Sequence, residues 1–170
     1  MANNNWGTPT HFIESARKVM GSIDCDPASN DAAQKVVQAG VYYTEETNGL
    51  DKIWEGNVWL NPPYGRGLAK PFIEYLSVMY HNGYVKQAII LTNSVYSSKW
   101  WNGSGTPDHC SAICLPNHRI AFINPDTGKP EDSNDRDQLI TYTGDNPDLF
   151  CEEFSKYGLC AKPSRPVSFM

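Results

Sequence analysis

Residues Asn61-Pro62-Pro63-Tyr64-Gly65 form a short motif that could bind a planar group carrying an amine. Pro62 and Pro63 lack backbone N–H donors and restrict two φ angles, so the motif should be a rigid turn with carbonyl groups free to accept hydrogen bonds. Asn61 adds a side-chain carbonyl and Tyr64 adds an aromatic face. Hydrogen-bond acceptors beside an aromatic ring can bind a planar group that carries an NH₂. The alternative is a proline-rich loop whose Tyr64 packs into the core.

The position of this motif between two regular elements favours the binding interpretation. Residues 57–60 have the pattern of a strand, and an apolar face recurs at helical spacing between Phe72 and Tyr80. The motif is therefore the turn at the carboxyl end of a strand. In open α/β sheets, ligands bind at that end of the strands.

Strands and helices alternate along most of the chain, which predicts one α/β domain over residues 1–170 with an antiparallel edge hairpin. The strand over 87–92 is apolar throughout and should be central. The hairpin is expected from the strands over 119–123 and 138–143. Thr8 and Pro9 should begin the first helix. The other predicted elements are helices over 8–20, 31–38 and 148–157 and strands over 22–25 and 111–115.

Charge and hydropathy narrow the class of protein. The chain has 170 residues, a formal net charge of −5 and a pI near 5.3. The excess of acidic over basic side chains lies mostly after residue 120, and five carboxylates lie within 124–137. This balance excludes tight non-specific binding to nucleic acid through bulk charge. No apolar run is long enough to span a membrane and the start does not resemble a signal peptide, so we expect a cytoplasmic protein.

The cysteines allow a second interpretation, a zinc site. Three residues separate Cys110 from Cys114, and His109 and His118 lie nearby in the sequence. Two further cysteines, Cys151 and Cys160, lie downstream. Structural zinc pairs usually have two or four intervening residues, and the segment reads as a buried strand. We therefore expect reduced, buried thiols and no metal. The alternative is a zinc-stapled module that binds nucleic acid without catalysis.

Several short motifs, in this order, resemble one family. They are Trp6-x-Thr8-Pro9-x2-Phe12, Asp24-x-Asp26-Pro27-x-Ser29-x-Asp31, Tyr43-Thr44, Gly49-Leu50-x3-Trp54-x-Gly56 and Trp59-Leu60-Asn61-Pro62-Pro63-Tyr64-Gly65. Together they are similar to the phage-type DNA N6-adenine methyltransferases, a Dam-like family with an Asn/Asp-Pro-Pro-Tyr motif. The resemblance covers residues 6–65 well and the rest of the chain only in patches.

The resemblance implies a Rossmann-like S-adenosylmethionine methyltransferase sheet and a catalytic role for Asn61, Pro62, Pro63 and Tyr64. The target adenine would leave the duplex and stack on Tyr64. The Asn61 side chain and the Pro62 carbonyl would then accept hydrogen bonds from its amine. Since Asn at this position also occurs in cytosine-N4 and protein-glutamine methyltransferases, those two substrates stay open.

The resemblance also implies where the cofactor binds. Acidic residues just after a strand suit ribose hydroxyls, which makes Asp26, before Pro27, the first candidate and Asp24 the second. The alternative for Asp26 is that it caps the next helix. The full set of expected cofactor residues is Trp6, Thr8, Pro9, Asp24, Asp26, Asn48 and Asn61.

The expected partner is double-stranded DNA in a bacterial host, with the enzyme encoded by a phage or prophage. Four basic residues near the predicted carboxyl edge could contact phosphates, and Trp100 or Trp101 could enter the vacated base stack. Both a monomer and a homodimer stay open. The four basic residues are Arg66, Lys70, Lys99 and Arg119.

Overall fold

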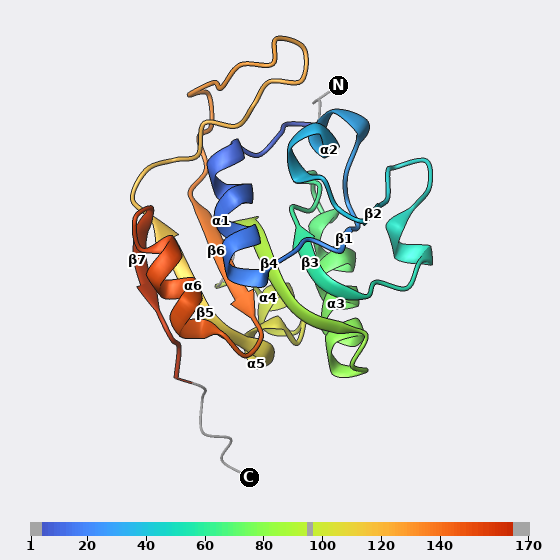
Figure 1. Ribbon diagram of the computed structural model, residues 1–170, viewed down its shortest axis with the longest axis vertical. Helices are drawn as coiled ribbons and strands as arrows, with labels where there is room; N and C mark the ends of the chain where they lie inside the picture. The colour runs from blue at the N-terminus through green and yellow to red at the C-terminus, as the bar shows by residue number, and fades with distance from the viewer. Residues whose placement is uncertain (1–4, 95–96, 165–170) are drawn as a thin grey trace.

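The computed structural model describes residues 5–94 and 97–164, and within them a single seven-stranded sheet forms the centre of the fold (Figure 1). The strand order is β2-β1-β3-β4-β6-β5-β7. The first four strands in this order pair in parallel, whereas β6, β5 and β7 pair antiparallel. The strands are β1 (Cys25–Asp26), β2 (Val41–Tyr42), β3 (Gly56–Leu60), β4 (Val85–Asn93), β5 (Cys110–Pro116), β6 (Gln138–Thr143) and β7 (Gly158–Ala161).

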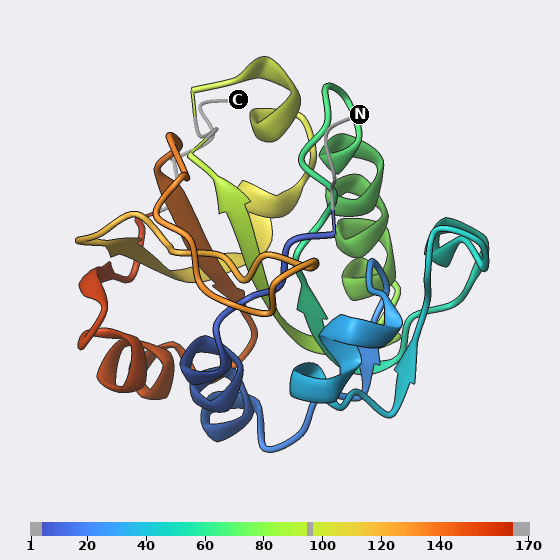
Figure 2. The ribbon, with the colours of Figure 1, turned by 90° about the horizontal axis from the view of Figure 1, so that it is seen from above.

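Helices cover both faces of the sheet, as Figure 2 shows from above. One face carries α1 (Thr10–Met20), α2 (Asp31–Val37) and α6 (Pro147–Phe154), and the other carries α3 (Ala69–His81), α4 (Lys99–Asn102) and α5 (Thr106–His109). A 3-10 turn, η1 (Gly49–Asp51), precedes β3. The chain thus forms a three-layer α/β structure.

Strand β4 shows how the apolar sequence supports these layers. Ile89 and Leu91 belong to the core beneath α1 and α6, and Ala88 and Ile90 belong to the core beneath α3. Successive side chains of a strand point to opposite faces. Since helices cover both faces here, all four side chains are fully buried. This confirms the prediction that the 87–92 strand is central.

The predicted hairpin of 119–123 with 138–143 is wrong. Residues 119–123 form no strand, and Ile123 makes only isolated bridges to Gly7 and Pro130. Strand β6 instead lies between β4 and β5, antiparallel to both. The apolar alternation in 119–123 reflects burial of Ile120 and Phe122 in the core, which a loop can achieve without a ladder.

The start of α1 also differs from the prediction. The helix begins at Thr10, with Pro9 as its N-cap residue and no side chain capping it. Thr8 therefore does not cap the helix, and its hydroxyl contacts Asn61 instead. Among the described residues, no helix is both long and apolar enough to cross a membrane.

Candidate active site

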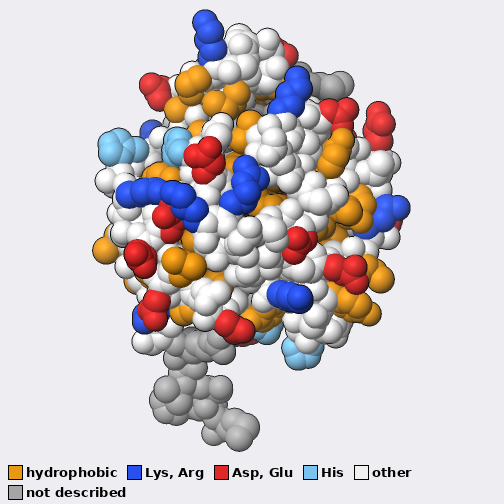
Figure 3. Space-filling model, viewed as in Figure 1, with side chains coloured by type: hydrophobic (Ala, Val, Ile, Leu, Met, Phe, Trp, Pro, Cys, Tyr) orange, Lys and Arg blue, Asp and Glu red, His pale blue; other side chains and the backbone are white. Residues whose placement is uncertain are grey.

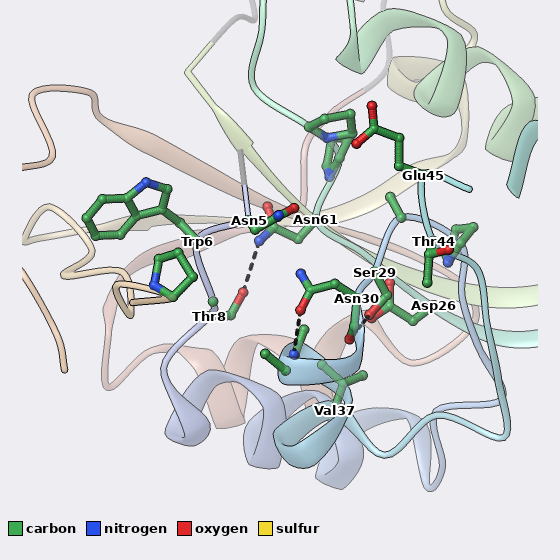
Figure 4. Close-up of a pocket in the computed structure, with 18 of the residues that line it drawn as sticks. Asn5, Trp6, Thr8, Asp26, Ser29, Asn30, Val37, Thr44, Glu45 and Asn61 are labelled. Atoms are coloured by element: carbon green, nitrogen blue, oxygen red, sulfur yellow. Dashed lines mark hydrogen bonds between the residues drawn. The ribbon is translucent and has the colours of Figure 1, made fainter. Parts of the chain in front are cut away.

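A cavity of about 530 Å³ opens at the carboxyl ends of β1 and β3. The segment before α1, the turn after β1 and the turn after β3 all contribute to its wall (Figure 4). In this view Trp6 and Asp26 lie at opposite ends of the cavity, with Asn61 between them. Most of the predicted catalytic and cofactor residues line it, namely Trp6, Thr8, Asp26, Asn48, Asn61, Pro62, Pro63 and Tyr64.

Asn61 presents a hydrogen-bond acceptor to this cavity. Its Nδ2 atom donates to Oγ1 of Thr8 over 3.1 Å. Its Oδ1 atom is buried and accepts no hydrogen bond from any described residue. A buried carbonyl oxygen without a partner is costly, typically about 1–3 kcal/mol, so this atom is poised for a donor from a bound molecule.

Tyr64 is held by its hydroxyl, which leaves its ring as the functional part. The hydroxyl donates to the carbonyl oxygen of Leu91 over 2.9 Å. Burial raises the pKa of Tyr64 far above its ordinary value, so the phenol stays neutral at physiological pH. The centroid of the Phe122 ring lies 6.2 Å from that of Tyr64. The side chain is therefore a fixed aromatic surface and not a proton donor or base.

Asp26 is the second buried acceptor on the cavity wall. Its Oδ2 atom accepts from Nε2 of Gln34 over 2.9 Å, and its Oδ1 atom has no partner among the described residues. Burial raises the pKa of Asp26 to about 7, and the nearby polar groups of Ser29, the Ala28 backbone and Gln34 offset only part of this shift. A carboxyl group in this position can accept hydrogen bonds from hydroxyl groups of a ligand.

Asp24 and Pro9, the other two residues expected at the cofactor, do not line the cavity. Asp24 accepts hydrogen bonds from the backbone N–H of Asn57 and from the Ser22 hydroxyl, at 2.8 and 2.9 Å. Its carboxylate therefore joins β3 to the segment before β1. Pro9 serves as the N-cap of α1.

The Gly49-Leu50-x3-Trp54 motif supports the turn that carries Asp26. A Cβ atom on Gly49 would lie 2.1 Å from the carbonyl oxygen of Pro27, so only glycine fits there. The indole of Trp54, which is fully buried, donates to the Gly49 carbonyl over 2.8 Å. Asn48 lines the cavity and accepts from the backbone N–H of Leu50.

A second cavity of about 580 Å³ meets the first at Trp6 and Tyr64, which line both. Sequence reasoning predicted Arg66 at this edge but missed the amide side chains that line the cavity. These come from the end of β4, the start of β6 and the loop before β6. The available signal was a polar residue, Asn93, at the end of an apolar strand. The missed residues are Asn93, Asn134 and Gln138, together with Arg136.

The predicted phosphate contacts are dispersed on the surface. Arg66 is exposed at the second cavity, and Lys99 is exposed at the start of α4. Lys70 pairs with Glu74, and Arg119 pairs with Asp137 at 3.3 Å. On the face in Figure 3, basic side chains are interspersed with acidic ones.

Trp101 and Cys114 have structural positions in the core. Trp101 is buried in the core beneath α3, so it does not enter a base stack, and the side chain of Trp100 lies outside the described residues. Cys114 is fully buried, and burial raises its pKa. The described part of the chain holds no group of three or more His, Cys, Asp or Glu placed to bind a metal ion.

Comparison with known proteins agrees with this geometry. The model of the family "DNA N-6-adenine-methyltransferase (Dam)" matches residues 1–148. The chain is 29% identical over 142 residues to the DNA N-6-adenine-methyltransferase of Haemophilus phage HP1 (strain HP1c1), which covers 79% of the chain and 75% of that protein. It is 31% identical over 149 residues to the enzyme of the same name from Escherichia phage T1, and the match covers 79% of the chain and 60% of that protein. The chain therefore belongs to the DNA N-6-adenine-methyltransferase (Dam) family.

Proposed function

We propose that the protein transfers a methyl group from S-adenosylmethionine to the N6 amine of adenine in double-stranded DNA. Family membership supports the reaction, and the observation that carries the site assignment is the meeting of two cavities at Trp6 and Tyr64, beside Asn61 in the first cavity. One cavity would hold the cofactor and the other the extruded base. The chain would act as one Rossmann-like methyltransferase domain over residues 1–170, in the cytoplasm of a bacterium that carries the phage or prophage.

The first cavity has polar groups that suit the cofactor. Asp26 Oδ1 is a buried acceptor suited to a ribose hydroxyl, and Asn48 offers an amide to the adenine edge of the cofactor. Trp6 and Thr8 would cover its methionine part. The bound cofactor supplies an electrophilic methyl group on a sulfonium, so the protein needs no covalent nucleophile.

At the junction of the cavities, the protein's contribution is alignment. Asn61 Oδ1 and the Pro62 carbonyl would accept both N–H groups of the adenine amine, which turns its lone pair toward the methyl group. The Tyr64 ring would stack on the base and offset about 1–3 kcal/mol of the cost of unstacking it. An N–C bond forms as the S–C bond breaks, and one amine proton leaves to solvent.

The proposal is tested by incubating the protein with tritiated S-adenosylmethionine and plasmid DNA, then separating the nucleosides. N6-methyladenine is the expected product, and sequencing of the modified DNA would give the recognition site. Label in N4-methylcytosine or protein glutamine would overturn the proposal in favour of the other two substrates. A protein without activity that contains stoichiometric zinc would favour the binding module.

Variants of the turn connect the activity to this site. Asn61→Ala should remove turnover and Tyr64→Ala should lower kcat/KM at least tenfold, while each leaves cofactor affinity, measured by calorimetry, within a few-fold of the wild type. Asn117→Ala, on the surface after β5, is the matched control with unchanged activity. Near-normal turnover of Asn61→Ala would show that the reaction takes place elsewhere.

A further inference from the structure

Three amide side chains form a hydrogen-bonded chain that ends at the second cavity. Asn134 Nδ2 donates to Gln138 Oε1 over 2.7 Å, and Gln138 Nε2 donates to Asn93 Oδ1 over 3.0 Å. All three residues line the cavity that contains the Tyr64 ring. Asn93 and Gln138 are direct partners in the β4–β6 ladder, so the backbone holds their side chains in register.

Backbone contacts fix the direction of this amide chain. Asn134 Oδ1 accepts from the backbone N–H of Arg136 over 3.0 Å, and Asn134 Nδ2 also donates to the carbonyl oxygen of Ile120 over 3.1 Å. A backbone N–H can only donate and a backbone carbonyl can only accept, so the Asn134 amide has one allowed orientation. Gln138 must then present Oε1 to Asn134 and Nε2 to Asn93.

The consequence is a hydrogen-bond donor at the cavity. Because Gln138 Nε2 donates to Asn93 Oδ1, the Asn93 amide is turned with its oxygen toward Gln138 and its NH₂ group away from it, which makes the NH₂ group the donor available to a ligand. Within the described residues, no side chain or backbone group accepts a hydrogen bond from Asn93 Nδ2. Gln138 in the middle of the chain is buried, whereas Asn93 and Asn134 at its two ends are half-buried. Asn134 Nδ2 already donates to Ile120 and Gln138, which leaves Asn93 as the end with an NH₂ group for a ligand.

We propose that Asn93 Nδ2 donates a hydrogen bond to N1 of the target adenine, with Gln138 and Asn134 as positioning residues that set its orientation; this rests on the proposed function. Adenine N1 is an acceptor next to the carbon that bears the amine, so Asn61 and Asn93 together offer an acceptor and a donor to the base edge. Guanine and thymine present a carbonyl and an N–H at these two places and would be rejected on both. Cytosine shares the adenine pattern, so this pair of contacts selects amino-bearing bases.

The test is a cycle that combines a change in the base with a change in the protein. Duplexes containing the mapped recognition site would carry adenine, 1-deazaadenine or 7-deazaadenine as the target base, and kcat/KM would be measured for each. The wild type should lose about tenfold on 1-deazaadenine, which lacks the acceptor N1. Asn93→Ala should lose about tenfold on adenine and show no further loss on 1-deazaadenine. Both proteins should respond equally to 7-deazaadenine, which retains N1.

Two further variants separate positioning from folding. Gln138→Met keeps the volume of the side chain but removes its donor, so the preference for adenine over 1-deazaadenine should fall while cofactor affinity is unchanged. Asn93→Asp keeps the shape but replaces the donor with an oxygen, and it provides the measurement if Asn93→Ala unfolds. Asn82→Ala, exposed at the end of α3, is the control that keeps the wild-type preference.

The outcomes distinguish this inference from the proposed function. Full retention of the tenfold preference by Asn93→Ala or Asn93→Asp would overturn the role of Asn93, even though the wild type methylates adenine. If the wild type and Asn93→Ala differed in their response to 7-deazaadenine but not to 1-deazaadenine, the assignment to N1 would be overturned. A wild-type protein that methylates no adenine in any DNA would overturn both proposals.

Discussion

The Asn61 amide nitrogen lies 3.1 Å from the Thr8 hydroxyl oxygen, although the two residues are 53 positions apart in the chain. This contact joins the segment before α1 to the turn after β3 and orients the Asn61 side chain. The other amide atom, Oδ1, is buried without a partner among the described residues. A contact outside the Pro-Pro-Tyr turn thus helps to hold the side chain of the turn that would meet the substrate.

Replacing Thr8 with Val should therefore slow catalysis more than it weakens binding. The substitution preserves shape but removes the hydroxyl, so the Asn61 amide loses its orientation and kcat should fall about threefold to tenfold. Steady-state kinetics with labelled cofactor would measure this, with Thr10→Val on the exposed start of α1 as the control. An unchanged kcat would show that Thr8 does not orient Asn61.

Tyr64 should tolerate loss of its hydroxyl but not of its ring. Tyr64→Phe removes the hydrogen bond to Leu91, which should lower the free energy of unfolding by about 1 kcal/mol and leave kcat within a few-fold. Tyr64→Ala also removes the stacking surface and should reduce kcat/KM at least tenfold, on the order of 1–3 kcal/mol. Chemical denaturation and kinetics of both variants would separate the two roles. A pH profile of Tyr64→Phe that differs from the wild type would contradict a neutral phenol.

Asp26 should make stability depend on pH. Its pKa is about 7 in the folded protein and near 3.8 when unperturbed, so the folded state binds the extra proton between these values. The stability due to this proton is complete below about pH 4 and is lost as the pH rises to about 7. Asp26→Asn should therefore gain Tm relative to the wild type across this range and hold that gain above it. A difference in Tm between Asp26→Asn and the wild type that stays constant with pH would refute the raised pKa.

Gly49→Ala should distort the turn that carries Asp26, because the added methyl group would clash with it. Its Cβ would lie 2.1 Å from the Pro27 carbonyl oxygen, so the backbone next to Asp26 must move. We expect a loss of about 2–3 kcal/mol in the free energy of unfolding, together with weaker cofactor binding by calorimetry. Gly67→Ala has open space around its Cβ and suffers only from its φ of +76°, which should cost about 1 kcal/mol and leave cofactor affinity intact. Equal cofactor affinities for the two variants would argue against this support role for Gly49.

Local patterns predicted the rigid turn and its place after a strand, because proline chemistry and apolar periodicity act over a few residues. They ranked Asp26 before Asp24 because of Pro27, but they kept both residues as candidates for the cofactor site. The two are separated by the ladder: Asp26 ends β1 at the cavity, whereas Asp24 precedes the strand and binds the Asn57 backbone. The same limit explains Asn93 and Gln138, since their contact depends on pairing between segments 45 residues apart.

The antiparallel insertion of β6 beside β4 has a consequence for how this enzyme can diversify. The carboxyl end of β4 and the amino end of β6 lie side by side, because Asn93 pairs with Gln138. The long segment before β6 must therefore bring the chain back to the end of β4. Six ladder pairs from Ala88–Thr143 to Asn93–Gln138 hold that point independently of the loop. A change in the length of this loop therefore need not move Asn93 or Gln138, whereas a change at Asn134 would remove the contact that the loop itself makes with Gln138.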